Sequence, residues 1–314
     1  MKANPSLVVA VGVVFTAFSA IFIRYSVAPP LVIATYRMGF TSILLTPLFI
    51  RERRRRHLSG TTNRAVNGLT PAILLSLLSG AFLAGHFALW ITSLSHTSVA
   101  NATVLVTTHP LLVAVLGLVL LGERISWKGA LWMIGAVAGG VLLVAGDLGG
   151  SESNLYGNLL AAGGAVTVSI YMIIGRYARR YLSVNAYTML VYWTAFATLT
   201  ATIAGAGIPL WPYPPRELAI FAALAVFCTL LGHSLFNWAL EFLPTTVVST
   251  SILGEPIIAT LLAMMLFGEV PALFTVSGGA VILTSIFFFV RDNSARERRE
   301  RLRGAPPSSP DAPV

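Results

Sequence analysis

The sequence is poor in cysteine and in charge. Its 314 residues include one cysteine, Cys228, and only 11% charged residues, with 2 lysines beside 19 arginines. A single cysteine excludes an internal disulfide and a metal site built on several thiolates. The H-E-x-x-H, G-x-S-x-G and P-loop motifs and the dinucleotide glycine fingerprint are absent as well. The sequence therefore predicts no catalytic residues, no cofactor site and no metal site.

Apolar residues dominate the chain instead. Hydrophobic residues make up 56% of it, and the mean hydropathy is +0.79, which is typical of a membrane protein rather than a soluble domain. A helix that spans a bilayer needs roughly 20 mostly apolar residues. We interpret ten such runs as transmembrane helices, at about residues 6–23, 31–50, 71–93, 98–121, 127–146, 156–175, 186–207, 217–240, 245–267 and 272–290. The predicted fold is therefore an all-α integral membrane protein.

The distribution of basic residues predicts which ends face the cytoplasm. With ten spans and a cytoplasmic N-terminus, every lysine and arginine except Arg24, Arg37 and Arg216 falls on the inner side. This pattern follows the positive-inside rule, and it predicts a multi-pass plasma (inner) membrane protein with both termini cytoplasmic. A sequence pI of about 10.2 would also suit a nucleic-acid-binding protein, but arginines that flank apolar spans favour topology and contact with anionic lipid. We expect membrane lipid and no nucleic acid among the partners, and leave the oligomeric state open.

A segment of the first half recurs 146 positions later with the same internal spacing. Pro110 and the Gly-Glu pair at 122–123 return as Pro256 and the Gly-Glu pair at 268–269. Each copy holds five predicted helices, so the two copies enter the membrane from opposite sides, as in the inverted repeats of secondary transporters. The predicted organisation is a first repeat at 1–146, a second at 147–291 and a disordered basic cytoplasmic tail at 292–314.

On these residues the chain resembles the drug/metabolite transporter superfamily, and specifically its EamA-type family. The resemblance covers about residues 6–290 and rests on Arg37, on Leu94-x-x-Thr97-Ser98-Val99-Ala100-Asn101-Ala102, on Leu121-Gly122-Glu123-Arg124 after Pro110, and on Glu255-Pro256 to Phe267-Gly268-Glu269. It implies a plasma membrane carrier with a central cavity lined by helices of both repeats. It does not identify the solute, because members of the family are thought to move many metabolites, mostly outward.

Two ionisable residues are predicted to lie near the bilayer midplane. Glu255 is about ten residues, or roughly 15 Å, into the ninth span, and His109 has a similar depth in the fourth span from the opposite face. Each precedes a proline, which opens the helix and frees carbonyl groups one turn earlier, and a buried ionisable group needs a partner or water. In one interpretation both residues line a substrate cavity and Glu255 exchanges a proton. In the other, the Glu-Pro pair is a packing or hinge element that never titrates.

Arg37 lies about six residues into the second span, or roughly 9 Å below the outer surface. Its guanidinium suits bidentate contact with a carboxylate or phosphate, and the amine of an amino acid would then face Glu255. The alternatives are snorkelling toward the outer surface and a structural ion pair.

His86 and Trp90 lie one helical turn apart in the third span and suit a cavity wall that takes a ligand of mixed polarity. Aromatic residues in such spans more often pack or anchor at the interface. The predicted substrate-binding residues are therefore His86, Trp90, His109, Glu255 and Arg37.

The prediction for function is a secondary transporter, not an enzyme. It would export a small metabolite, amino-acid-like or another small organic solute, by alternating access, with proton coupling as an option. The alternative is an integral-membrane enzyme acting on a lipid or isoprenoid. Such an enzyme should cluster its acid, base or metal residues at one interfacial level, whereas the ionisable residues here are scattered through several depths, which favours a translocation path.

Overall fold

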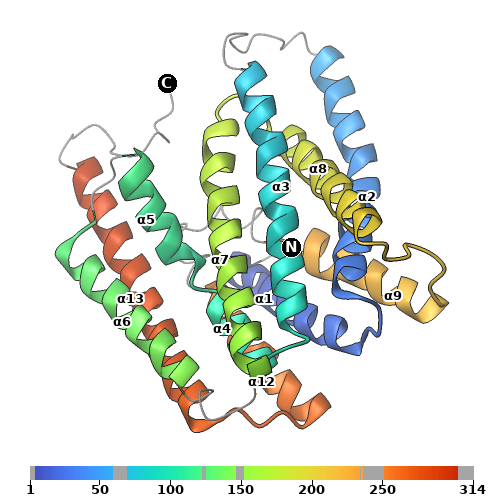
Figure 1. The fold of residues 1–314 in the computed structure, drawn as a ribbon. Helices are drawn as coiled ribbons and strands as arrows, with labels where there is room; N and C mark the ends of the chain where they lie inside the picture. Colours follow the sequence, from blue (N-terminus) through green and yellow to red (C-terminus); the bar gives the residue numbers. More distant parts are fainter. Residues whose placement is uncertain are drawn as a thin grey trace.

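The structure, a computed structural model, describes residues 4–58, 69–121, 125–145, 152–233, 235 and 251–302. Helices fill most of these ranges (Figure 1): α1 (Pro5–Tyr25), α2 (Pro30–Leu58), α3 (Leu69–Ser93), α4 (Val99–Val106), α5 (His109–Leu121), α6 (Trp127–Ala145), α7 (Glu152–Ala178), α8 (Val184–Gly205), α9 (Pro215–Ala223), the π-helical segment η2 (Leu224–His233), α12 (Gly254–Phe267) and α13 (Leu273–Leu302). Eight helical stretches are long and apolar enough to cross a membrane, and two apolar helices are shorter, Trp127–Leu143 and Gly254–Phe267. The protein is thus a multi-pass helical membrane protein.

The predicted span at 98–121 corresponds to the candidate membrane span Val99–Leu120, but its helix is interrupted, because α4 ends at Val106 and α5 begins at His109. Pro110 lacks an N–H, so carbonyl groups one turn earlier lose their helical donor. Side chains replace it: the Thr108 hydroxyl donates to Leu105 O at 2.7 Å, and His109 Nδ1 lies 3.2 Å from Val106 O. The break is therefore stabilised by the residues around the proline.

Two other predicted boundaries differ from the structure. The eighth predicted span is α-helical only to Ala223 and then continues as a π-helix through His233, and residues 236–250 lie outside the described part. The tail, predicted to be disordered from residue 292, is helical as far as Leu302, because α13 continues beyond the apolar span. Arginine, glutamate and alanine are good helix formers, so a helix that starts in the membrane extends into this segment. The predicted disorder of residues 303–314 falls outside the described residues.

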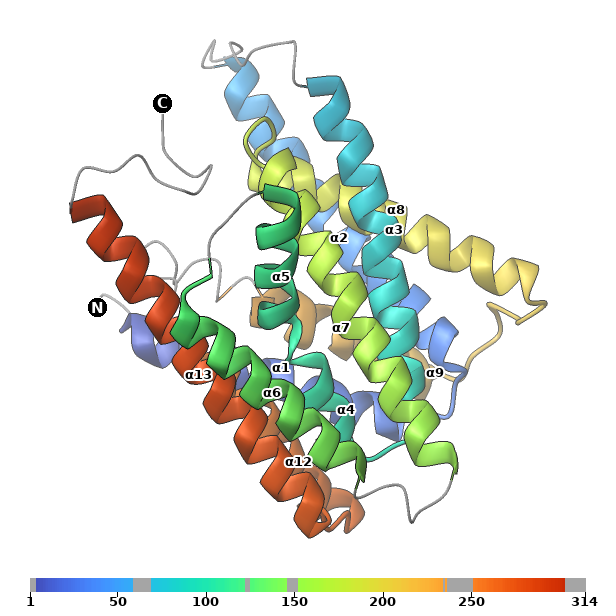
Figure 2. The ribbon, with the colours of Figure 1, turned by 60° about the vertical axis from the view of Figure 1, so that its left-hand side comes forward.

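Helices that are distant in sequence pack side by side. In both ribbon views α3 lies against α7, and α6 lies along α13 (Figures 1 and 2). Further contacts join α2 and α3 to α8, α1 to η2 and α12, and α7 to both α4 and α5. Because each of these pairs joins the first half of the chain to the second, the buried core lies largely between the halves.

The relative direction of the two helices is clear for two of these pairs, α2 with α8 and α6 with α13. Along α2 from Gly39 to Thr46, the contacts on α8 run backwards, from Phe196 to Met189. The same holds for α6 and α13, where a Cβ at Gly135 would approach Ser285 and one at Gly139 would approach Gly278. Both helix pairs are therefore antiparallel.

Small residues permit the closest of these approaches. A Cβ added to Gly139 would lie 2.9 Å from Gly278 O, and one added to Gly278 would lie 2.7 Å from Gly139 O. Those neighbours are backbone atoms and cannot rotate away, so glycine at both positions lets α6 and α13 meet backbone to backbone, as in many membrane helix pairs.

Candidate functional site

Arg37 is the most deeply buried arginine that the structure describes, with 2% of its surface exposed on α2. Its Nε donates to the Thr229 hydroxyl at 3.0 Å, and its Nη1 donates to the Ser19 hydroxyl at 2.8 Å. Thr229 in turn donates to Leu224 O, five residues earlier in the π-helical turn. The guanidinium thus sits where α1, α2 and η2 meet, and it does not snorkel toward the membrane surface.

An aromatic row on α3 begins at this guanidinium. The Arg37 Cζ atom lies 4.5 Å from the centre of the Phe87 ring, which places a π-face against the cation. Phe87 meets the His86 ring edge to face, and His86 stacks on Trp90 with 6.1 Å between centroids. The structure therefore brings together three of the five predicted site residues, Arg37, His86 and Trp90, through one unpredicted phenylalanine.

Two residues of this row, His86 and Trp90, also touch α7. His86 Nδ1 lies 2.9 Å from Gly164 O, and a Cβ at Gly164 would sit 3.4 Å from Trp90 Cβ. Trp90 is 5% exposed, and its indole Nε1 is buried without a hydrogen-bond acceptor among the described residues. A buried N–H without an acceptor costs about 1–3 kcal/mol, so this donor needs explanation.

Glu255 lies in the first turn of α12, in the second half of the chain, and acts on the same region. It is half-buried, its carboxylate is in hydrogen-bond contact with the Thr16 side chain, and it interacts electrostatically with Arg37. The two residues do not form an ion pair, and no other described carboxylate pairs with Arg37. The predicted alternative of a structural ion pair for Arg37 therefore does not hold within the described residues.

His109, the fifth predicted site residue, stands apart from this cluster. It opens α5, its side chain contacts Val106 O, and its backbone carbonyl accepts from the Ser169 hydroxyl of α7 at 3.2 Å. These contacts join the α4–α5 break to α7, whereas the contacts of Arg37 involve other helices. His109 and Glu255, matched in sequence, thus have different neighbours.

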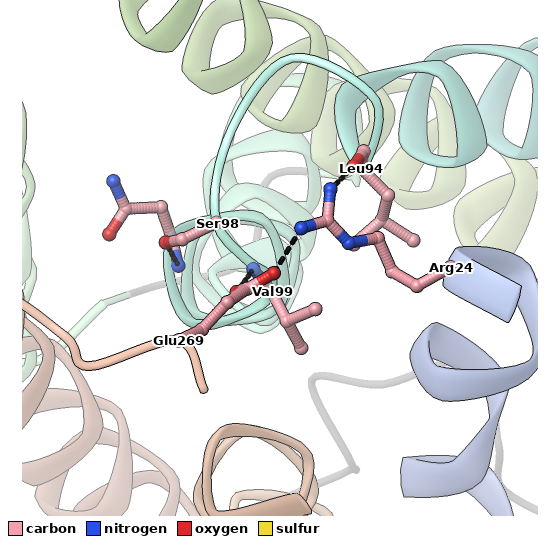
Figure 3. A network of polar contacts seen from close by, with 6 residues as sticks. Arg24, Leu94, Ser98, Val99 and Glu269 are labelled. Carbon is pink, nitrogen blue, oxygen red and sulfur yellow. Dashed lines mark hydrogen bonds and ion pairs between the residues drawn. The ribbon is translucent and has the colours of Figure 1, made fainter. Parts of the chain in front are cut away.

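A second polar cluster ties together three helix ends (Figure 3). Arg24, in the last turn of α1, donates to Leu94 O at 2.8 Å and forms an ion pair with Glu269. The other carboxylate oxygen of Glu269 accepts from the Val99 N–H at 3.0 Å, in the first turn of α4, where Ser98 is the N-cap. A carboxylate is favourable at a helix N-terminus. We call Arg24, Leu94, Val99 and Glu269 the Arg24 network.

The repeated Gly-Glu pair explains how Glu269 reaches this position. Gly268 ends α12 in the left-handed conformation, with φ of 67°, which glycine adopts without steric cost. Its N–H bonds to Met264 O and the next N–H bonds to Ala263 O, so the chain turns sharply at the end of the helix. The first copy of the pair, at 122–123, lies outside the described residues.

Sequence reasoning missed Ser19, Thr229 and Phe87 as neighbours of Arg37, because each is an ordinary residue for a membrane helix. The role of Glu269 had a usable signal. A Gly-Glu pair at the end of a repeated apolar helix, together with Arg24 at the end of another, indicated that two helix ends carry opposite charges.

The sequence of this chain is similar to those of known proteins. The model of the EamA-like transporter family matches twice, over residues 5–145 and 155–291. The chain belongs to this family. An uncharacterized transporter of Archaeoglobus fulgidus is 25% identical over 295 residues, which cover 91% of this chain and 97% of the relative. A protein named pseudopaline exporter CntI, from Pseudomonas aeruginosa, is 25% identical over 219 residues, covering 67% of this chain and 72% of the relative.

A solved structure, described only as the crystal structure of a protein, superposes on this chain with a TM-score of 0.60 and 18% sequence identity. The superposition covers 94% of this chain and 100% of the solved chain. That likeness concerns the fold alone. The family and the names of its relatives make this chain a membrane transporter, and they describe no catalytic activity.

Proposed function

We propose that this EamA-family protein is a secondary transporter of the plasma (inner) membrane that exports a small organic solute, amino-acid-like or of similar size. Transport would proceed by alternating access between two inverted five-helix repeats, 1–146 and 147–291, with both termini in the cytoplasm. The separate family matches to the two halves support the repeats. The printed name of one relative, an exporter, agrees with outward transport.

The observation that carries this proposal is the direction of the helix pairs across the halves. In the proposed alignment of the repeats, α2 corresponds to α8 and α6 corresponds to α13. Both pairs are in contact and antiparallel. Helices that correspond to each other but point in opposite directions are what an inverted repeat requires.

The proposed substrate site lies between the halves, with Arg37, His86 and Trp90 on one side, and with Glu255 and His109 from the first turns of α12 and α5, where each precedes a proline. The proposed orientation places the Arg24 network at the outer end. There it would hold α1, α4 and α12 together and keep the pathway closed on that side until the solute has bound.

Purified protein in proteoliposomes tests this function. Vesicles are loaded with a panel of labelled amino acids, sugars, nucleotides and organic acids, with and without a pH gradient, and efflux is followed over time. We expect at least one class to leave faster than from protein-free vesicles, and a pH gradient to change that rate if protons are coupled. Retention of the whole panel under both conditions would contradict the proposal.

A further inference from the structure

We propose that Arg37 anchors a carboxylate group of the transported solute; this inference rests on the transporter function proposed above. The residue offers three possible roles: snorkelling to the surface, a structural ion pair, or contact with an anionic ligand. The guanidinium is 2% exposed and bonds inward to Ser19 and Thr229, so it does not snorkel. It has no ion pair with a described carboxylate. Contact with a ligand is the role that remains.

The uncompensated charge is the first argument. A cation removed from water is costly unless an opposite charge or several hydrogen bonds replace its hydration. Arg37 receives two hydroxyl contacts and one aromatic face, all of them neutral. Glu255 acts on it through space without a direct contact. An anion in the region between Arg37 and Glu255 would supply the missing charge.

The free edge of the guanidinium defines how that anion approaches. Nε is taken by Thr229 and one Nη1 donor by Ser19, whereas Nη2 has no acceptor among the described residues. Side-on binding through Nε and Nη2 would have to displace Thr229. The end of the fork, with Nη2 and the second Nη1 hydrogen, is the edge that a planar carboxylate can meet. Phe87 covers one face of the cation and limits approach from that direction.

Trp90 supplies an independent observation. Its Nε1 is a buried donor without an acceptor among the described residues, and it lies one turn along α3 from Phe87, on the same row of rings. Buried indole N–H groups usually find an acceptor. A ligand with oxygen acceptors would satisfy each of these two donors, which lie on adjacent helices.

The balance of charge favours a carboxylate over a phosphate. Arg37 is a single cation, and the Glu255 carboxylate acts on the same region. A phosphate monoester carries about two negative charges near neutral pH and would meet repulsion from Glu255, whereas a carboxylate carries one. A solute with both a carboxylate and an amine would meet Arg37 with the first group and Glu255 with the second.

The experiment compares matched solutes in proteoliposomes. Vesicles are loaded with leucine, phenylalanine and glutamine, with the corresponding amino-acid amides, which lack the carboxylate, and with phosphoserine and glucose 6-phosphate. We expect the amino acids to leave roughly tenfold or more faster than their amides, since a charge-assisted hydrogen bond inside the protein is worth at least one such factor. The phosphorylated solutes should leave no faster than the amides.

Variants then assign the difference to Arg37. Arg37→Gln should slow the amino acids to the rate of the amides and leave the amides unchanged, and Arg37→Lys, which keeps the charge but not the fork, should retain part of the preference. Trp90→Phe keeps an aromatic ring but removes the pyrrole ring together with its N–H, so it should slow the amino acids a few-fold. Arg54→Gln is the control, because Arg54 is exposed at the far end of the same helix, and it should keep the full preference.

Folding is checked separately by size-exclusion chromatography of each variant. If Arg37→Gln does not fold, Arg37→Lys and Trp90→Phe carry the test, and wild-type preference in both would overturn the inference. Equal efflux of amides and acids from the wild type would also overturn it while leaving the transporter function intact. If neither the amino acids nor their amides leave the vesicles, binding is measured instead. The amino acids should then raise the melting temperature of the detergent-purified wild type and not that of Arg37→Gln. Equal melting temperatures with and without amino acids in the wild type would overturn the inference. The transporter function itself fails only if the wider panel is retained as well.

Discussion

Two arginines, thirteen positions apart in the sequence, occupy opposite environments. The Arg24 side chain is 32% exposed and contacts a carboxylate, a carbonyl group and an aromatic ring. These belong to Glu269, to Leu94 and to Phe267, whose ring centre lies 5.9 Å from the Arg24 Cζ atom. Arg37 is 2% exposed and has two hydroxyl groups and a ring at 4.5 Å, with no described carboxylate in contact. The fully paired arginine is the accessible one, and the incompletely paired arginine is buried.

The difference matters because the energetic value of a contact depends on burial. An exposed ion pair contributes about 0–1 kcal/mol, since water would solvate both partners if it opened. A buried charged donor that loses its acceptor costs about 1–3 kcal/mol or more, since nothing replaces it. The Arg24 network is therefore suited to opening and closing. The Arg37 cluster is suited to holding its geometry and to responding strongly when an anion arrives.

The acids that accompany the two arginines give the largest expected effect. Glu269 is bound on both oxygens, by Arg24 and Val99, whereas Glu255, among the described residues, contacts the Thr16 side chain and interacts with Arg37 without a direct contact. We expect Glu255→Gln to remove the pH dependence of transport altogether, because the amide has nearly the same shape and cannot exchange a proton. The measurement is efflux from proteoliposomes across a series of external pH values.

Glu269→Gln is the matched control and should keep the pH dependence of the wild type, since this carboxylate lies in the Arg24 network. If transport by Glu255→Gln still follows pH as the wild type does, Glu255 is not the coupling residue. Glu255 and Glu269 would then differ in their contacts but not in their effect on the pH dependence of transport.

The hydroxyl that supports Arg37 gives the next largest effect. Thr229→Val preserves shape and leaves Nε without its acceptor, so the variant should lose about 2 kcal/mol of stability. The expected readout is a fall of several degrees in the apparent melting temperature of the detergent-purified protein. Thr229→Ser keeps the hydroxyl and is the control; an equal fall in both variants would assign the loss to packing of the threonine methyl group rather than to the hydrogen bond.

Much of the fold follows from the sequence for a simple physical reason. A bilayer requires continuous apolar helices, and apolar runs are visible without tertiary information. Each of the ten predicted runs contains helix in the described part of the chain. The break between α4 and α5 follows from Pro110, whose missing N–H was recognised, but the predicted run passed through it because Thr107 and Thr108 are compatible with a continuous helix by composition.

The site follows from the sequence only in part. Arg37 stands out because a charge in an apolar run is costly wherever it lies. Its neighbours Ser19, Thr229 and Phe87 do not, since hydroxyl and aromatic residues are common in such helices and only the packing of α1, α3 and η2 selects these three. The sequence match of His109 to Glu255 does not reveal its neighbours either, which include Val106 and α7.

Opening the Arg24 network gives the smallest expected effect on stability and the most informative one on conformation. Arg24→Gln should lower the stability of the closed state proposed for this end of the protein by about 1 kcal/mol, which shifts an open-to-closed ratio by roughly fivefold. Val99, whose N–H belongs to the network, has a fully buried side chain, so Val99→Cys provides a thiol that is protected while the network is closed. A membrane-impermeant maleimide should then label Val99→Cys about fivefold faster when Arg24→Gln is also present.

Arg54→Gln in the same Val99→Cys background is the control and should label at the slow rate, because it removes an exposed arginine from the other end of α2. Cys228 is fully buried and is replaced by alanine in all three proteins to remove background reaction. High salt should accelerate labelling when Arg24 is present and should have little effect in Arg24→Gln, since screening acts on the ion pair. Equal labelling rates with and without Arg24 would mean that the network does not gate the proposed outer end. The contrast between Arg24, in a network that opens, and Arg37, in a cluster that keeps its geometry, would then no longer hold.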